Sequence, residues 1–64
     1  MFSFKKYYTF VIGYEANIGS SLNRSTGTVD ALFYVSEDKI RHEIIKQAQD
    51  KGLRMVQILE FEKL

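Results

Sequence analysis

Three segments of the chain alternate at a period of two residues, whereas only one segment has the spacing of a helix. We expect strands at residues 4–14, 26–35 and 53–61, and a helix at residues 37–51. Each of these strands places apolar side chains on both of its faces. Because one helix covers only one face of a sheet, the fold has to leave a partly apolar face without a covering layer.

The helix has a defined start, an apolar stripe and a defined end. Ser36 suits the N-cap, because its hydroxyl can accept a hydrogen bond from a backbone N–H of the first turn. Glu37 and Asp38 place negative charge at the positive end of the helix dipole. Gly52 can adopt the left-handed conformation that ends a helix. The apolar stripe is formed by Ile40, Ile44, Ile45 and Ala48.

The alternation also assigns side chains to faces. In the first strand, one face carries Phe4, Tyr8, Phe10, Ile12 and Tyr14, and the other carries Lys5, Tyr7, Thr9 and Val11. In the third strand, one face carries Leu53, Met55, Gln57, Leu59 and Phe61, and the other carries Arg54, Val56, Ile58 and Glu60.

The element order is β-β-α-β, which defines an α+β fold. The first two strands form a hairpin, and the helix is a right-handed crossover that makes the second and third strands parallel. The first strand is the longest and most apolar, so we place it in the centre. We therefore expect a three-stranded mixed sheet in the order 2-1-3, with 1-2-3 as the alternative, and one helix packed on one face.

Composition limits what can stabilise such a fold. The chain has 64 residues and is expected to form a single small domain over residues 1–64. A domain of this size buries only about 60% of its unfolded surface, so its stability is marginal. The chain has no cysteine and one histidine, His42, which excludes disulfides, thiolate metal sites and multi-histidine metal sites. Self-association is then the remaining source of added stability.

Charge and hydropathy bear on location. The net charge of +1 is too small to favour nucleic acid or an anionic membrane. No apolar run reaches the ~18 residues of a membrane span. The apolar run near the start is interrupted by Glu15, so we expect no signal peptide. The lack of cysteine fits a reducing compartment, and we expect a cytoplasmic protein without membrane contact.

A polar segment, ANIGSSLNRSTGTV, separates the first two strands. Its glycines do not have the spacing of a phosphate-binding loop, and a strand follows where such a loop needs a helix. We expect a long flexible hairpin loop at residues 16–26. Its larger side chains, Ile18, Leu22 and Arg24, are candidates for contact with a partner.

Catalysis has little support. His42 has Asp38 and Lys46 as its neighbours on the helix, and the hydroxyl-rich segment is a mobile loop unsuited to holding a nucleophile. The eight carboxylates show no pairing typical of hydrolases. We therefore expect no enzymatic activity, no catalytic residue, no cofactor and no metal.

The uncovered sheet face supplies the functional hypothesis. An exposed apolar patch of several hundred Å² usually marks an interaction site. We expect a protein–protein interaction module, a homodimer with a further unknown protein partner, whose size and architecture resemble accessory or inhibitor proteins of phages and mobile elements. The expected interface comprises Tyr7, Val11, Leu32, Tyr34, Met55 and Leu59. The alternative is a nucleic-acid-binding module in which Tyr7, Phe33 and Tyr34 stack on bases beside Lys5 and Lys6.

Overall fold

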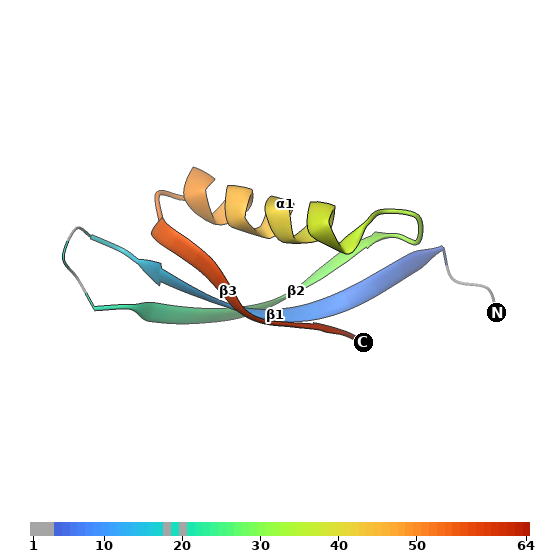
Figure 1. Ribbon diagram of the computed structural model, residues 1–64, viewed down its shortest axis with the longest axis horizontal. Helices are drawn as coiled ribbons and strands as arrows, with labels where there is room; N and C mark the ends of the chain where they lie inside the picture. Colours follow the sequence, from blue (N-terminus) through green and yellow to red (C-terminus); the bar gives the residue numbers. More distant parts are fainter. Residues whose placement is uncertain (1–3, 18, 20) are drawn as a thin grey trace.

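A computed structural model describes residues 4–17, 19 and 21–64, and it confirms the β-β-α-β order (Figure 1). The elements are β1 (Lys5–Glu15), β2 (Asn23–Leu32), α1 (Glu37–Asp50) and β3 (Arg54–Lys63). The helix lies on one face of the sheet, and none of the elements formed by the described residues covers the opposite face (Figure 1). The fold class predicted from the sequence is therefore confirmed.

The sheet has the order β2-β1-β3, which confirms 2-1-3 and excludes 1-2-3. Both neighbouring pairs are antiparallel, and the two outer strands run in the same direction without pairing. The ladder between β1 and β2 is uninterrupted from the pair Lys5↔Leu32 to the pair Tyr14↔Asn23. The hairpin is therefore a long regular ribbon.

The second strand begins and ends three residues earlier than its predicted span of 26–35. Residues 23–25 extend the ladder because their backbone groups find partners on the far end of β1, which outweighs the turn preference of their polar side chains. The connecting loop is therefore residues 16–22, shorter than the predicted 16–26. Residues 33–35 turn toward the helix, and the Val35 N–H donates to the Leu32 carbonyl at 3.0 Å.

The helix forms as its sequence signals indicate. The Ser36 hydroxyl accepts from the Lys39 N–H at 3.2 Å, so the predicted N-cap is confirmed. After Asp50 the chain turns through Lys51 and Gly52, and Gly52 has a φ of 89°. The helix buries Ile40, Ile44 and Ala48 against the sheet.

The core is small and lies between α1 and one face of β1. Its buried members are Tyr8, Ile12, Ile40, Ile44 and Ala48. Tyr8 is only 1% exposed, and its ring stacks on Phe61 with centroids 4.7 Å apart. The Arg41 guanidinium lies 4.8 Å from the centroid of the Phe61 ring, so a helix cation covers this stack.

The third strand departs from simple alternation at two places. Leu59 is an extra residue between Ile58, which pairs with Ile12, and Glu60, which pairs with Val11. A second irregularity sets Met55 and Val56 opposite one residue of β1, and Met55 has a φ of 52°. The first bulge moves Phe61 to the helix face, so its predicted placement with Leu59 is wrong.

The molecule is elongated, with principal extents of 48 × 17 × 15 Å and a radius of gyration of 13.0 Å. A compact domain of this length has a radius of gyration of about 11 Å. A helix of 14 residues is about 21 Å long, whereas a strand of 11 residues spans about 36 Å. The helix therefore covers only part of the sheet even on its own side.

Candidate interaction surfaces

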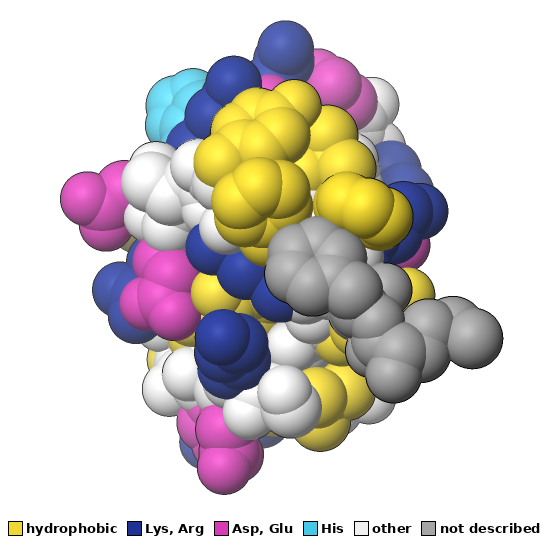
Figure 2. Space-filling model, turned by 90° about the vertical axis from the view of Figure 1, so that its right-hand side faces the viewer, with side chains coloured by type: hydrophobic (Ala, Val, Ile, Leu, Met, Phe, Trp, Pro, Cys, Tyr) yellow, Lys and Arg dark blue, Asp and Glu magenta, His cyan; other side chains and the backbone are white. Residues whose placement is uncertain are grey.

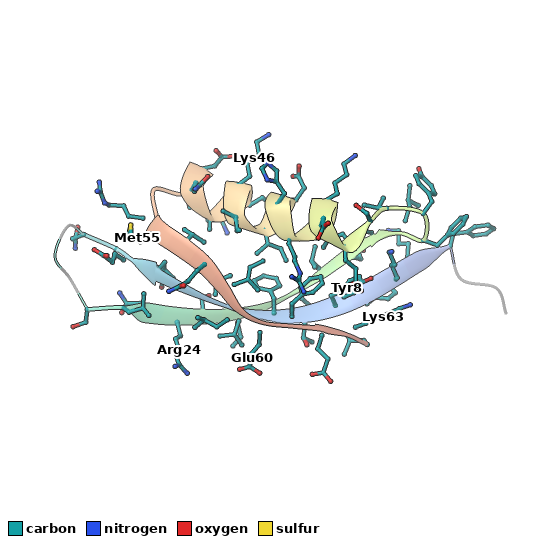
Figure 3. All side chains as sticks on the ribbon, in the orientation of Figure 1. Tyr8, Arg24, Lys46, Met55, Glu60 and Lys63 are labelled. Atoms are coloured by element: carbon teal, nitrogen blue, oxygen red, sulfur yellow. The ribbon has the colours of Figure 1, made fainter. Side chains whose placement is uncertain are left out.

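The open face of the sheet is the face opposite α1. Register places the odd-numbered residues of β1 there, together with their partners on β2: Lys5, Tyr7, Thr9, Val11, Gly13, Arg24, Thr26, Thr28, Asp30 and Leu32. Figure 3 shows Arg24 and Glu60 directed away from the helix, whereas Tyr8 points toward it. The prediction that Tyr7, Val11 and Leu32 share the uncovered face agrees with this register.

At the hairpin end, the open face carries a small apolar group that we call the tip cluster: Val11, Leu22 and Leu59 around Gly13. A Cβ on Gly13 would lie 3.2 Å from Leu59 Cδ1 and 3.4 Å from Leu22 Cδ2, so both leucines rest on this glycine. Leu22 remains 51% exposed and Leu59 37% exposed. The extra residue of the β3 bulge thus contributes an apolar side chain to the open face.

At the other end, Tyr7 and Leu32 are exposed diagonal neighbours on the open face. The Leu64 N–H donates to the Tyr7 carbonyl at 2.8 Å, which places the exposed Leu64 beside Tyr7. We call Tyr7, Leu32 and Leu64 the base cluster. Lys5 and Asp30 form an ion pair of 3.5 Å next to it.

A polar band separates the two clusters. A shallow depression of about 280 Å³ lies between them, lined by Thr9, Val11, Thr26, Thr28, Glu60 and Glu62 among others. The continuous apolar patch expected from the sequence is therefore divided in two. Threonine and glutamate side chains fill the middle of the sheet face.

Two residues expected on the sheet face lie elsewhere. Tyr34 belongs to the turn after β2, where it meets Phe33 edge to face with ring centroids 5.4 Å apart. Met55 is exposed in the bulge at the start of β3, and its side chain lies on the side of the sheet away from Arg24 (Figure 3). Their predicted place on the sheet face is wrong, because the second strand ends earlier and the third strand is bulged.

The turn after β2 forms a third exposed apolar surface, the aromatic turn, made of Phe4, Phe33 and Tyr34. Their exposed fractions are 63%, 57% and 70%. The Phe33 N–H donates to the Phe4 carbonyl at 2.9 Å, which holds the turn against the start of β1. Figure 2 shows hydrophobic side chains gathered at this end of the molecule.

The outer edge of β2 is a further surface, and sequence reasoning did not anticipate it. Phe4 bonds toward β2 and Tyr7 bonds toward β3, so alternate residues of β1 bond to opposite neighbours. Even-numbered residues of β1 pair with odd-numbered residues of β2, as in Tyr8↔Val29. The even-numbered residues of β2, from Arg24 to Leu32, therefore direct their N–H and C=O groups outward.

A groove runs between α1 and β2. One part has a volume of about 390 Å³ and an apolar floor that includes Phe10, Ile12 and Val29. A second part of about 200 Å³ continues past Ala31 and Val35. Every residue of β2 is exposed or half-buried, and Val29 and Ala31 pack against the core, so the helix covers this strand only in part.

The titratable groups of the described residues include one exposed histidine and one buried tyrosine. His42 is exposed on the helix, and no group of three metal-ligating side chains occurs among the residues that the structure describes. Burial raises the pKa of the Tyr8 hydroxyl above its usual value of 10.0, and the Glu37 carboxylate raises it further. This tyrosine belongs to the core.

The candidate loop residues have separate positions. Leu22 is in the tip cluster and Arg24 is on β2, while Ile18 lies outside the described residues. Whether this loop is flexible stays a prediction. No helix in the described ranges has the length and apolar character needed to cross a membrane. No family model, curated protein or solved structure matches this chain.

Proposed function

We propose that this protein is a non-enzymatic protein–protein interaction module that acts as a homodimer and presents exposed apolar surface to a protein partner. One observation carries the proposal: within the described residues, more large hydrophobic side chains are exposed than buried. The exposed set is Phe4, Tyr7, Leu22, Leu32, Phe33, Tyr34, Met55, Leu59 and Leu64. They gather in the tip cluster, the base cluster and the aromatic turn, with Met55 apart.

Energetics support self-association. Burying apolar surface contributes about 25 cal/mol per Å², so a few hundred Å² contributes several kcal/mol. A domain whose described residues include only five buried hydrophobic side chains has a small stability of its own. Association with a second copy therefore stabilises the folded chain by mass action.

Charge on the open face favours a protein over a nucleic acid. Asp30, Glu60 and Glu62 lie on this face beside Lys5 and Arg24, so the face lacks the excess of positive charge that a phosphate backbone requires. The aromatic residues Phe33 and Tyr34 lie in the turn after β2, whereas a base-stacking platform with Tyr7 would need them on the sheet face. The proposal includes a cytoplasmic location and an accessory or inhibitor role, which rest on composition and size.

Sedimentation velocity tests the proposal. We expect a monomer–dimer equilibrium between low-micromolar and several-hundred-micromolar protein, and a melting temperature that rises with concentration. A chain that stays monomeric throughout contradicts the homodimer. A titration with single-stranded DNA at two salt concentrations is the control, and tight binding that weakens steeply with salt supports nucleic acid instead.

A further inference from the structure

We infer that two copies pair through the outer edges of their β2 strands, antiparallel and with the two-fold axis at Gly27, to form one six-stranded sheet. This inference deepens the proposed homodimer and rests on it. The occupant of the β2 edge is thus a second copy of this chain, the partner.

The outer edge of β2 is regular and unprotected. β2 has ten consecutive ladder pairs with β1, no bulge and no proline. Its outward N–H and C=O groups form an unprotected row, which is a template for pairing with another strand. Because α1 leaves a groove beside β2, a second strand can approach this edge without meeting the helix.

The direction of the main-chain groups restricts the register of the β2–β2 pairing. Only the even-numbered residues of β2 direct main-chain groups outward, so a hydrogen-bonded pair across the interface must join two even-numbered residues. In a two-fold antiparallel pairing, this condition places the axis on a residue of β2. The candidates nearest the middle of the strand are Gly27 and Thr28, followed by Thr26 and Val29.

The side chains that face each other across the interface distinguish these positions of the axis. With the axis at Gly27, Arg24 faces the partner's Asp30 and Thr26 faces the partner's Thr28. Leu22 faces the partner's Leu32 in the same register. With the axis at Thr26, Arg24 faces a threonine and Asp30 faces a leucine. With the axis at Thr28, Arg24 faces a leucine and Asp30 faces a threonine. With the axis at Val29, Arg24 faces residue 34, beyond the end of the strand, and Asp30 faces a threonine.

Only the Gly27 register matches charge with opposite charge, threonine with threonine and leucine with leucine. Such cross-strand pairs are the favourable ones on an antiparallel sheet. Two-fold symmetry repeats each pair, so the dimer contains two Arg24–Asp30 pairs. Between described residues within one copy, Asp30 has the Lys5 ion pair, and Arg24 has no ion-pair partner.

Packing at the axis fits this register. A Cβ on Gly27 would lie 2.6 Å from Phe10 Cζ, so the Phe10 ring occupies the space of a side chain at this position. Gly27 faces the partner's Gly27 as a non-hydrogen-bonded pair, where strands approach to Cα separations of about 4.5 Å. The two Phe10 rings then cover the axis on the helix side.

The pairing also joins surfaces that are separate in one copy. Leu22 of the tip cluster comes beside the partner's Leu32, which belongs to the base cluster. The open face of the six-stranded sheet then has two larger apolar areas, related by the two-fold axis. These areas are the surface that the dimer offers to a third protein.

Charge exchange between Arg24 and Asp30 tests the inference. Arg24→Asp sets a new carboxylate against the partner's Asp30, and Asp30→Arg sets a new guanidinium against the partner's Arg24. Each single variant should raise the dimer dissociation constant at least about tenfold, because two like-charge pairs replace two opposite-charge pairs. The double variant R24D/D30R should restore dimerisation to within a few-fold of wild type.

Mixing the two single variants gives the most specific test of the pairing. R24D carries only acids at these two positions and D30R carries only cations, so an equimolar mixture should form heterodimers while each variant alone sediments as a monomer. Arg54→Asp and Glu60→Arg change the net charge by the same amounts on β3, and both should dimerise as wild type does. Circular dichroism verifies that every variant is folded.

The outcomes separate this inference from the proposed function. If wild type dimerises but R24D and D30R dimerise equally well and do not prefer each other, the β2 pairing is overturned and the homodimer stands. If wild type is a monomer at every concentration, both fail. Preferential heterodimer formation with rescue by the double variant supports the β2 pairing.

Discussion

The sheet has two outer edges, β2 and β3, and they differ in the regularity of their pairing with β1. β3 is interrupted by a bulge at Leu59 and a second irregularity at Met55, and it is joined to α1 by a three-residue turn. β2 runs through ten ladder pairs without interruption, beside a groove. Bulges are one means by which proteins prevent edge-to-edge association. β3 carries this protection and β2 does not, which is why the proposed pairing uses the β2 edge.

Both edge strands belong to the sheet on which the helix packs. The largest expected effect is therefore a loss of stability from a substitution in the core between the helix and the sheet. Ile44→Ala should lower the free energy of unfolding by about 2–5 kcal/mol, because Ile44 is buried against the sheet. Urea denaturation at fixed protein concentration measures this. Ile45→Ala is the matched control, since Ile45 is only half-buried, and it should cost clearly less. Equal losses would contradict the assigned helix face.

The second largest effect is expected from proline substitutions, which should weaken the dimer on β2 but not on β3. Thr28→Pro removes an outward N–H of β2 and leaves the ladder to β1 intact, since edge strands tolerate proline where the N–H faces solvent. We expect a folded chain whose dimer is weaker by at least about 1 kcal/mol, the net worth of a lost hydrogen bond. Lys63→Pro removes an outward N–H of β3 and should leave dimerisation unchanged. Sedimentation equilibrium compares the two variants.

Leucine-to-lysine changes on the open face give a smaller contrast. Leu32→Lys on β2 places a charge opposite the partner's Leu22 and should weaken the dimer several-fold. Leu59→Lys on β3 lies away from the β2 edge and should leave the dimer unchanged. Analytical size exclusion over a dilution series distinguishes them. A dimer lost in L59K and kept in L32K would place the interface on the tip cluster.

Ionisation of Tyr8 at alkaline pH should have the smallest effect on stability. It should affect both edges equally, because Tyr8 lies in the shared core. The folded-state pKa of Tyr8 is raised above its usual 10.0 by burial and by Glu37. The folded chain therefore holds this proton more tightly, so its contribution is complete below pH 10 and is lost as the pH rises through the folded pKa. The Tyr8 hydroxyl should therefore cause no change of stability with pH near neutrality and a fall above about pH 10. Tyr8→Phe should remove this part of the fall in thermal denaturation.

The sequence predicts this fold to the extent that local signals carry it. The Ser36 cap, the stripe of Ile40 and Ile44, and the central position of the first strand all depend on nearby residues, and all are confirmed. Leu59 and Phe61 show the limit. Alternation at period two places them on one face, but the bulge that separates them arises from pairing with Val11 and Ile12, which lie far away in the sequence.

The candidate site was harder to predict for the same reason. The sequence indicated a surplus of apolar surface, and the structure places Tyr7, Val11, Leu32 and Leu59 on the open face. The sequence does not reveal the edge of β2, because its alternation predicts a strand that begins three residues late and leaves Arg24 in the loop. The spacing of Arg24 and Asp30 about Gly27 has meaning only once both lie on one strand.

The most direct test of the β2 pairing is an isotope-filtered nuclear Overhauser experiment on dimers of one labelled and one unlabelled copy. The Gly27 register makes Ser25 and the partner's Val29 a non-hydrogen-bonded pair, whose Cα atoms approach to about 4.5 Å. We expect a strong intermolecular Hα–Hα contact between Ser25 and the partner's Val29, in both directions. Intermolecular contacts confined to Leu22, Leu59 or the aromatic turn, with none along β2, would contradict it.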